Sequence, residues 1–280
     1  MKLLSQIKKD MEFNQNLSSL IEVLKEIAIA QYHTMEKKLK SYDKLFSILE
    51  SFFEIIPAEL DEMQHPLLNL GNRPLGVIAV TSDTGLLGAL NMQVMNLALR
   101  EVETNKAKLI IIGEKGKIYA QESNTAFASF PGVQDENRFA QAIQLRDYIV
   151  GEELARRLGP LKIIYPYAAS IMNQRIQTVQ LLPFSKPKKA QSYFSSEMVI
   201  ESPIESIVGY LVYLFLGQTF YDIFGDSRLA EMAARFIHLE ESGHKLEDLE
   251  KGLRLQYFRQ KHELIDRNMR ELFAARSAFK

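Results

Sequence analysis

The two ends of the chain carry one pattern of apolar positions, and the middle carries another. From Leu3 to about Ile56, apolar residues recur at alternating steps of three and four, and the same spacing returns from Leu229 to Phe279. A mean repeat near 3.5 residues is typical of a coiled-coil seam. The seam positions include Leu17, Leu20, Leu24 and Ile27 in the first stretch, and Met232, Leu239, Leu246 and Leu253 in the second. We therefore expect two long helices, each spanning roughly 75–80 Å at 1.5 Å per residue, that pair antiparallel.

The middle of the chain alternates short apolar runs with helical patterns. Strands are predicted over 76–81, 108–113, 126–130 and 161–167, with a further strand over 177–184 at an edge or in a hairpin. Helices are predicted over 89–103 and 139–158. This alternation predicts a Rossmann-like α/β domain with mainly parallel strands. The chain then divides into an N-terminal coiled-coil helix (1–57), the α/β domain (74–200) and a C-terminal helix (203–280) that completes the coiled coil.

Composition excludes several classes of protein. The net charge is −1, which gives no bias toward nucleic acid, and the chain has no cysteine for disulfides or thiolate metal sites. Charged residues in the first 13 positions argue against a signal peptide. The most apolar stretch, 207–224, is interrupted by glycines and polar residues and is too short for a membrane span. We expect a cytoplasmic protein that can work beside the inner face of a membrane.

The motifs that could carry chemistry are weak. Gly85 to Gly88 and Gly113 to Gly116 each follow a predicted strand, but neither matches the Walker or the dinucleotide-binding spacing. Tight strand-to-helix turns explain these glycines better. The pairs Glu62…His65 and Glu241…His244 have the E-x-x-H spacing of di-iron bundles, yet solvated charge is the more economical interpretation. We predict no catalytic residue, no metal site and no cofactor.

At this point the residues resemble a known family, the γ subunits of F-type rotary ATP synthases, over nearly the whole chain. The segment 81–91, TSDTGLLGALN, is similar to the family's TSDRGLCGGLN, and 180–184 is similar to its QLLP element. The tripeptide 230–232 resembles the family's A-R-M, and the pattern from Tyr257 to Met269 resembles its terminal YNxARQxxITxEL. These four matches occur in the family's order, between long helices at both ends.

The departures from the family pattern indicate a divergent member. Thr84 stands where the family has arginine, Glu26 where methionine is usual, and Glu231 where A-R-M has its arginine. Four extra residues between Gly243 and Tyr257 are expected to act as a stutter that unwinds the supercoil locally. A reversed charge at 231 cannot keep the family's ion pair with the catalytic subunit.

The resemblance implies a non-catalytic rotor in the central stalk of a rotary ATPase. Its implied partners are a ring of three catalytic and three non-catalytic nucleotide-binding subunits, with an ε-like subunit and a membrane rotor ring as further partners. The residues implied to meet the ring are Lys9, Leu17, Leu24, Glu26, Glu231, Arg259, Lys261, His262, Ile265, Asp266, Asn268, Met269 and Phe273. Two alternatives stay open: a coiled-coil adaptor of the same fold without a motor, and a nucleotide-binding enzyme whose helices dimerise.

Overall fold

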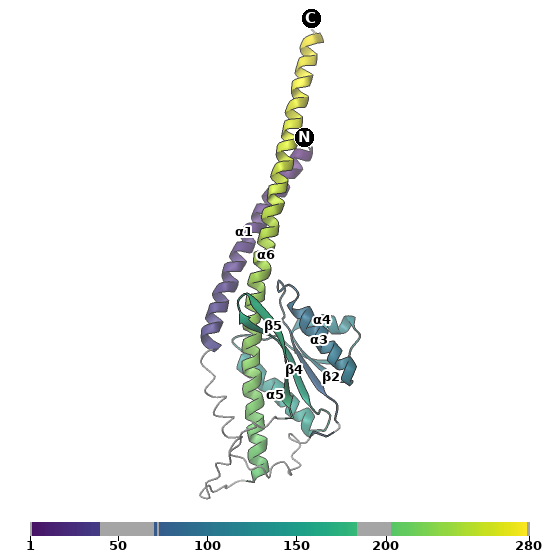
Figure 1. Cartoon of the computed structure of the whole chain (residues 1–280), viewed down its shortest axis with the longest axis vertical. Helices are drawn as coiled ribbons and strands as arrows, with labels where there is room; N and C mark the ends of the chain where they lie inside the picture. The colour runs from purple at the N-terminus through teal and green to yellow at the C-terminus, as the bar shows by residue number, and fades with distance from the viewer. Residues whose placement is uncertain (1, 40–69, 72, 184–202, 279–280) are drawn as a thin grey trace. The chain divides into compact units, whose positions relative to one another are not determined.

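The computed structural model describes residues 2–39, 70–71, 73–183 and 203–278. In chain order the elements are α1 (Lys2–Leu39), β1 (Gly76–Val80), α3 (Leu90–Asn105), β2 (Lys108–Ile112), α4 (Glu114–Glu122), β3 (Phe127–Phe130), α5 (Arg138–Leu154), β4 (Leu161–Ser170), β5 (Asn173–Leu182) and α6 (Ile204–Ala278) (Figure 1). The predicted pair Glu62…His65 and the predicted end of the first helix lie outside the described residues.

The chain forms two compact units. The helical unit comprises residues 1–29 and 236–280, and the sheet unit comprises residues 30–235. Both α1 and α6 contribute residues to both units, because each helix continues across the boundary. The predicted division into segments 1–57, 74–200 and 203–280 stays a prediction.

The sheet unit is built on a five-stranded mixed sheet in the order β3-β2-β1-β4-β5. Strands β3, β2, β1 and β4 are parallel, with Gly76 opposite both Lys108 of β2 and Leu161 of β4. Strand β5 runs antiparallel to β4 and forms the edge of the sheet. The predicted Rossmann-like sheet is confirmed, and the fifth strand lies in a hairpin at the edge.

Helices cover both faces of this sheet, because alternate side chains of its central strands are apolar on both sides. Val77 and Ala79 of β1 pack with Val94 and Met95 of α3, and Ala120 of α4 joins them. On the other face, Ile78 packs in one cluster with side chains of α5 and of the first part of α6, including Leu145, Ile149, Leu216 and Phe220. The result is a three-layer unit whose α3 and α4 layer is visible in Figure 1.

One helix was not expected from the sequence, and another is longer than its glycines would suggest. Helix α4 was not predicted, because its nine residues are too short for a clear helical period. Helix α6 runs without a break from Ile204 to Ala278, through Gly225 and Gly243. At Gly225 a Cβ would lie 2.3 Å from Leu39 Cδ2 of α1, so this glycine lets the Leu39 side chain pack close to the backbone of α6.

A repeated arginine–tyrosine contact joins α5 to α6. Arg138 lies over the ring of Tyr221, and Arg146, eight residues later, lies over the ring of Tyr213, eight residues earlier. Arg138 Nη2 donates to the Tyr221 hydroxyl at 2.6 Å. Arg146 Nη2 also lies 2.9 Å from Asp147 Oδ1, so both buried guanidinium groups have polar as well as aromatic partners. The equal spacing also shows that α5 and α6 run antiparallel in this contact.

Glu153, near the end of α5, is a buried acid in this unit. Its residue is 0% exposed, and neither carboxylate oxygen has a hydrogen-bond partner in the described part of the chain. Arg73 Nη1 lies 3.5 Å from Glu153 Oε2, which is an ion-pair distance. Burial raises the pKa of Glu153 to about 8, and Arg73 only partly offsets this effect.

The raised pKa of Glu153 predicts how stability depends on pH. Between about pH 4.5 and 8 the folded state binds one more proton than the unfolded chain, so this residue makes the free energy of unfolding fall as pH rises. Glu153→Gln removes that fall. We expect the variant to gain about 1–3 kcal/mol over the wild type at pH 8 and to lose this advantage near pH 4.5, in urea unfolding at several pH values.

Glu152→Gln is the matched control for this experiment. Hydrogen bonding from Arg157 lowers the pKa of Glu152, so its contribution to stability is present above its ordinary pKa and is lost as pH falls. The control variant should therefore be less stable than the wild type at neutral pH, with a difference that shrinks in acid. The same pH profile for the Glu153→Gln variant and the wild type would contradict the assignment.

Candidate functional site

The carboxyl ends of parallel strands are where open α/β sheets usually bind ligands, and here the chain's own side chains meet at that edge. Asp83 follows β1 in the TSDTG segment. Its Oδ1 accepts the backbone N–H of Glu114 at 2.9 Å and that of Gly132 at 3.0 Å. Glu114 begins α4, so a carboxylate of this chain occupies the helix N-terminus where a phosphate would otherwise be stabilised.

Glycines let the loops after β1, β2 and β3 approach one another. A Cβ on Gly132 would lie 2.4 Å from Asp83 Oδ1, and one on Gly116 would lie 2.5 Å from Thr81 Oγ1. Thr81 Oγ1 accepts the Gly116 N–H at 3.0 Å and donates to the Ile112 carbonyl at 2.7 Å. Gly113 has a φ of +100°, which agrees with the prediction of a tight strand-to-helix turn at 113–116. We call this cluster of loops, residues 81–85, 113–116 and 131–135, the loop cluster.

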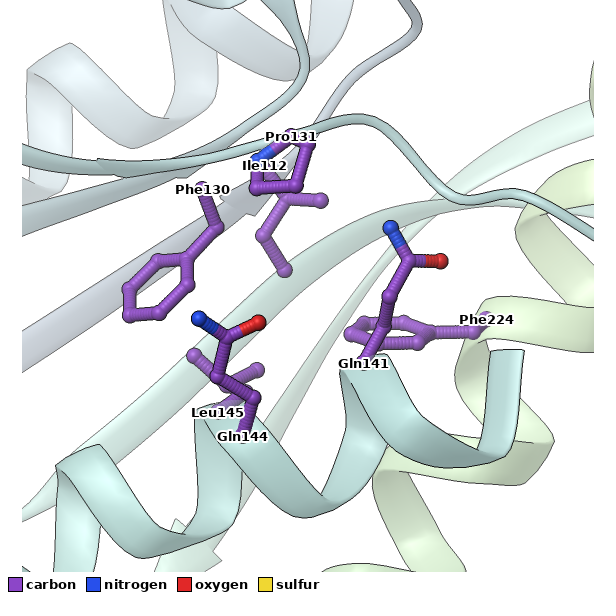
Figure 2. Close-up of a pocket in the computed structure, with 7 residues that line it drawn as sticks. All are labelled: Ile112, Phe130, Pro131, Gln141, Gln144, Leu145 and Phe224. Atoms are coloured by element: carbon purple, nitrogen blue, oxygen red, sulfur yellow. The ribbon is translucent and has the colours of Figure 1, made fainter. Parts of the chain in front are cut away.

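A small hollow lies beside the loop cluster, at the ends of β2 and β3 (Figure 2). Its lining residues are Ile112, Phe130, Pro131, Gln141, Gln144, Leu145 and Phe224. The Gln141 amide is already engaged, because it donates to the Gly132 carbonyl at 2.9 Å and accepts the Gln134 N–H at 2.8 Å. No charged side chain lines this hollow, so it offers no general acid or base and no cationic side chain for a phosphate.

The other candidate surface lies on the helical unit, where α1 and α6 pair antiparallel. Asn14 Nδ2 donates to the Leu246 carbonyl at 3.1 Å, and Lys25 Nζ lies 2.9 Å from Glu240 Oε2. The α6 partner number falls as the α1 number rises, which confirms the predicted antiparallel pairing. Asn14 is buried, and a polar residue in such a seam favours a single register.

The buried seam of α1 differs from the predicted one. Its innermost positions include Ile7, Asn14 and Ala28, which are spaced by multiples of seven. Leu20 and Ile27, predicted in the seam, are instead exposed, and Leu17 and Leu24 are half-buried. The apolar arc of α1 is wider than one partner helix covers, so sequence periodicity placed the seam at the wrong edge of this arc.

The helical unit therefore leaves a large number of apolar side chains exposed. They are Phe13, Leu20, Val23 and Ile27 on α1, and Leu249, Leu255, Phe258, Ile265, Met269, Leu272 and Phe273 on α6. Phe13 is 69% exposed and Phe273 is 64% exposed. Isolated exposed apolar residues are common, but a set that follows helical spacing along two paired helices marks an interaction surface.

The last part of α6 has no α1 residue opposite it within the described chain. Continuing the register from Asn14 and Lys25 places Lys2 opposite roughly residue 260. Every described residue from 265 to 276 is exposed. Ile265, Met269, Leu272 and Phe273 follow one another at steps of four, three and one, so they form a stripe along one side of the helix.

Most of the predicted contact residues have exposed side chains in the helical unit. Lys9, Glu26, Arg259, Lys261, His262, Ile265, Asp266, Asn268, Met269 and Phe273 are all exposed in the helical unit. Leu17 and Leu24 are half-buried on the same unit. The structure thus places twelve of the thirteen residues in the helical unit. Sequence reasoning missed the exposed line of Phe13, Leu20 and Ile27, although its seven-residue spacing was readable.

Glu231 is the exception, because it belongs to the sheet unit and lies inside it. The residue is 3% exposed, and its Oε2 lies 2.6 Å from Arg228 Nη1. Burial raises the pKa of the Glu231 carboxyl, and the positive charge of Arg228 opposes this rise. Its ion-pair partner therefore lies within the chain. Spacing placed Glu231 in the A-R-M element but could not show which way it faces.

The E-x-x-H pair Glu241…His244 lies on α6 in the helical unit. His244 of the Glu241…His244 pair is exposed, with Glu240 at 3.6 Å and Glu247 at 3.8 Å on the same helix. Among the described residues, no group of three or more histidine and acidic side chains could hold a metal ion. None of the described helices is both long and apolar enough to cross a bilayer.

Comparison with known proteins gives this geometry its context. A family model described as ATP synthase matches residues 3–279. The chain belongs to the ATP synthase family. The ATP synthase gamma chain of Desulfitobacterium hafniense is 23% identical over 270 residues, which cover 94% of each chain. The ATP synthase gamma chain of an Exiguobacterium species is 22% identical over 284 residues, covering 98% of each.

Solved structures of the ATP synthase family share the fold. A chain of the Euglena gracilis mitochondrial ATP synthase, in a structure of OSCP, F1 and c-ring, matches with a TM-score of 0.72 at 14% identity, covering 99% of this chain and 95% of that one. A chain of the Tetrahymena thermophila central stalk and c-ring matches with a TM-score of 0.61 at 17% identity, covering 80% and 99%. At these identities the likeness establishes the fold.

The loop cluster generates a prediction about Asp83. Asp83→Ala removes the acceptor of two backbone N–H groups, and we expect it to lower the free energy of unfolding by about 1–3 kcal/mol, measured by urea unfolding. Asp83→Asn is the matched control, because its side-chain oxygen can still accept both N–H groups. Equal stability of the Ala variant and the wild type would show that Asp83 does not hold the loops together.

Proposed function

We propose that this chain is the non-catalytic central-stalk rotor of an F-type rotary ATPase. The observation that carries the proposal is the helical unit, whose paired helices expose apolar side chains on α1 and along the terminal stripe of α6. Such a surface suits a shaft enclosed by partner subunits, because the partners would bury what the chain itself leaves exposed. Membership of the ATP synthase family, and relatives named gamma chains, support the same function.

The absence of catalysis is part of the proposal. In the loop cluster Asp83 fills the position where a nucleotide phosphate would meet a helix N-terminus, and like charges would repel. The neighbouring hollow is lined by apolar and amide side chains. These features favour a sheet unit that serves as a structural part of a rotor, with hydrolysis carried out by the partner subunits.

The proposed partners are a hexamer of catalytic and non-catalytic nucleotide-binding subunits, an ε-like subunit and a membrane rotor ring. The shaft is asymmetric, so it would contact each catalytic subunit differently and give the three sites different nucleotide affinities. Hydrolysis at one site would change which contacts are most favourable, and the shaft would turn by population shift. In this arrangement the chain is peripheral to a membrane rather than embedded in it.

We assign the ring contacts in two classes. The apolar bearing comprises Leu17, Leu24, Ile265, Met269 and Phe273, and the polar contacts comprise Lys9, Glu26, Arg259, Lys261, His262, Asp266 and Asn268. Apolar contacts are non-directional, so they hold the shaft without fixing one angle. The polar contacts would favour particular angles. Because Glu231 is balanced by Arg228 within the sheet unit, the proposal leaves it out of the ring-contact set.

The terminal stripe gives a direct test of the bearing. Met269→Gln with Phe273→Gln should weaken assembly with the ATPase hexamer by roughly tenfold or more, since each buried apolar side chain contributes about 1.5–3 kcal/mol. The readout is the dissociation constant of the full-length chain and the hexamer, measured by biolayer interferometry. The melting temperature of the isolated chain should not change, because both side chains are exposed.

The control for this test is Arg267→Gln with Glu271→Gln, which makes the same number of glutamine substitutions with no net change in charge. Both residues lie on the part of α6 turned away from the stripe, by the 3.6-residue period of the helix. We expect near wild-type affinity. Failure of the wild-type chain to bind the hexamer would instead favour an adaptor without a motor.

A second test separates the rotor from a nucleotide-binding enzyme. Addition of ATP or ADP with Mg²⁺ at 1 mM should leave the melting temperature of the isolated chain unchanged, because a ligand raises it only if it binds the folded state. The isolated chain should also show no ATPase turnover. A rise of several degrees, or turnover in a preparation free of contaminating ATPases, would overturn the non-catalytic assignment.

A further inference from the structure

Two arginines of α6 bind loops at the carboxyl edge of the sheet. Arg228 Nε lies 3.1 Å from Asp135 Oδ1, in the loop after β3. Arg235 Nη2 donates to Thr84 Oγ1 at 2.6 Å, in the loop after β1. Both partners belong to the loop cluster. All these residues lie in the sheet unit, and Arg235 is its last residue before the helix continues into the helical unit.

The spacing of the two arginines allows their contacts to oppose rotation of α6 about its own axis. Positions 228 and 235 are seven apart, so they lie on nearly the same side of α6 and roughly 10 Å apart along its axis. Two attachment points on one side of a rod resist rolling about its axis as well as tilting. Hydrogen bonds and ion pairs are directional, whereas the apolar packing of α6 on the sheet is not.

Glu231 forms an ion pair with Arg228 and so helps to fix the position of its guanidinium group. It lies three residues after Arg228 and four before Arg235, so the three side chains are neighbours on the helix. Its carboxylate binds Arg228 at 2.6 Å in a buried setting. A guanidinium bound by both Glu231 and Asp135 has little rotamer freedom left, and the ion pair is shielded from solvent on the Glu231 side.

The loops that receive the arginines are hydrogen-bonded to one another. Asp83, next to Thr84, accepts the N–H groups of Glu114 and Gly132 and so ties the loops after β1, β2 and β3 together. Ser82 Oγ donates to the Thr84 carbonyl at 2.8 Å, which fixes the backbone at the attachment point. The arginines therefore bind a rigid part of the sheet unit rather than two independent loops.

We propose that Arg228 and Arg235, with Glu231, Asp135 and Thr84, form a torque-bearing bracket that fixes the rotational angle of α6 on the sheet unit. This inference rests on the proposed function, because a rotor must pass torque between its shaft and its base. The five residues are positioning residues that act through α6. Their loss makes the rotor torsionally softer without removing any of the residues assigned to the ring.

The test measures torsional stiffness in the assembled complex. The chain has no cysteine, so Glu122→Cys on exposed α4 gives a unique attachment site for a bead on the sheet unit. With the hexamer fixed to a surface, the angular variance of the bead during ATP-waiting pauses reports torsional compliance. In the Arg228→Gln/Arg235→Gln variant we expect this variance to rise roughly twofold or more, because both charge-assisted links to the loops are lost.

Arg254→Gln is the matched control, since Arg254 lies on the same helix and its ion pair with Glu250 is confined to α6. Its angular variance should equal that of the wild type. If the double variant does not fold, Thr84→Val/Asp135→Asn replaces it, because these changes weaken the two links from the loop side and leave α6 unaltered. A raised variance in that variant supports the bracket equally.

The possible results distinguish failure of the bracket proposal from failure of the proposed rotor function. A wild-type complex that rotates, together with bracket variants whose angular variance is unchanged, overturns the bracket alone, even if their melting temperatures fall. A wild-type complex that hydrolyses ATP without rotating overturns the proposed function and the bracket with it. Raised variance in the bracket variants and not in the Arg254→Gln variant establishes the bracket.

Discussion

The constraint on which this structure depends is that the apolar side chains of one 75-residue helix must be covered by different partners along its length. The first part of α6 packs on the sheet with α5, through residues such as Val212 and Phe220. Further along, α1 packs against it in antiparallel register. Beyond that, the described chain supplies no cover, and the apolar stripe ending at Phe273 is exposed. A helix continues through all three environments because its backbone hydrogen bonds are local, while burial of its side chains depends on whatever lies alongside.

The carboxyl edge of the sheet shows how one backbone arrangement can serve two purposes. In ligand-binding α/β folds, glycine-rich turns and a helix N-terminus receive a phosphate there. Here the same features receive Asp83, and the close contacts at Gly116 and Gly132 leave no room for a side chain. An acidic side chain at that position converts a potential ligand site into a junction between three loops. This junction also supplies Thr84 and Asp135 to the two arginines of α6, so the sheet and the helix are joined where a ligand would otherwise lie.

Four arginines of the sheet unit connect α6 to its neighbours. Arg138 and Arg146 of α5 lie over Tyr221 and Tyr213, whereas Arg228 and Arg235 of α6 reach the loops. Each guanidinium gains a ring or a polar partner that offsets its desolvation. Glu231 fits this arrangement as an internal counter-charge, which explains how the chain carries an acid where the resembling family has arginine. The Glu231 carboxylate has its ion-pair partner, Arg228, within the same helix.

The sequence by itself determined the long helices, the parallel strands and the family, because apolar periodicity and short motifs are local properties of the chain. It predicted β1 and β2 to within a residue. Twelve of the thirteen residues proposed as ring contacts lie in the helical unit, which exposes apolar side chains. Only the tertiary structure decided that the α1 seam runs through Ile7, Asn14 and Ala28 and not through Leu20 and Ile27, because an apolar arc wider than one partner leaves its buried edge undetermined. Likewise, only three-dimensional contacts could show that Glu231 points inward to Arg228 and that Asp83 joins three loops. These partners are distant along the chain or depend on which side of a helix is covered, and neither property is recorded in local spacing.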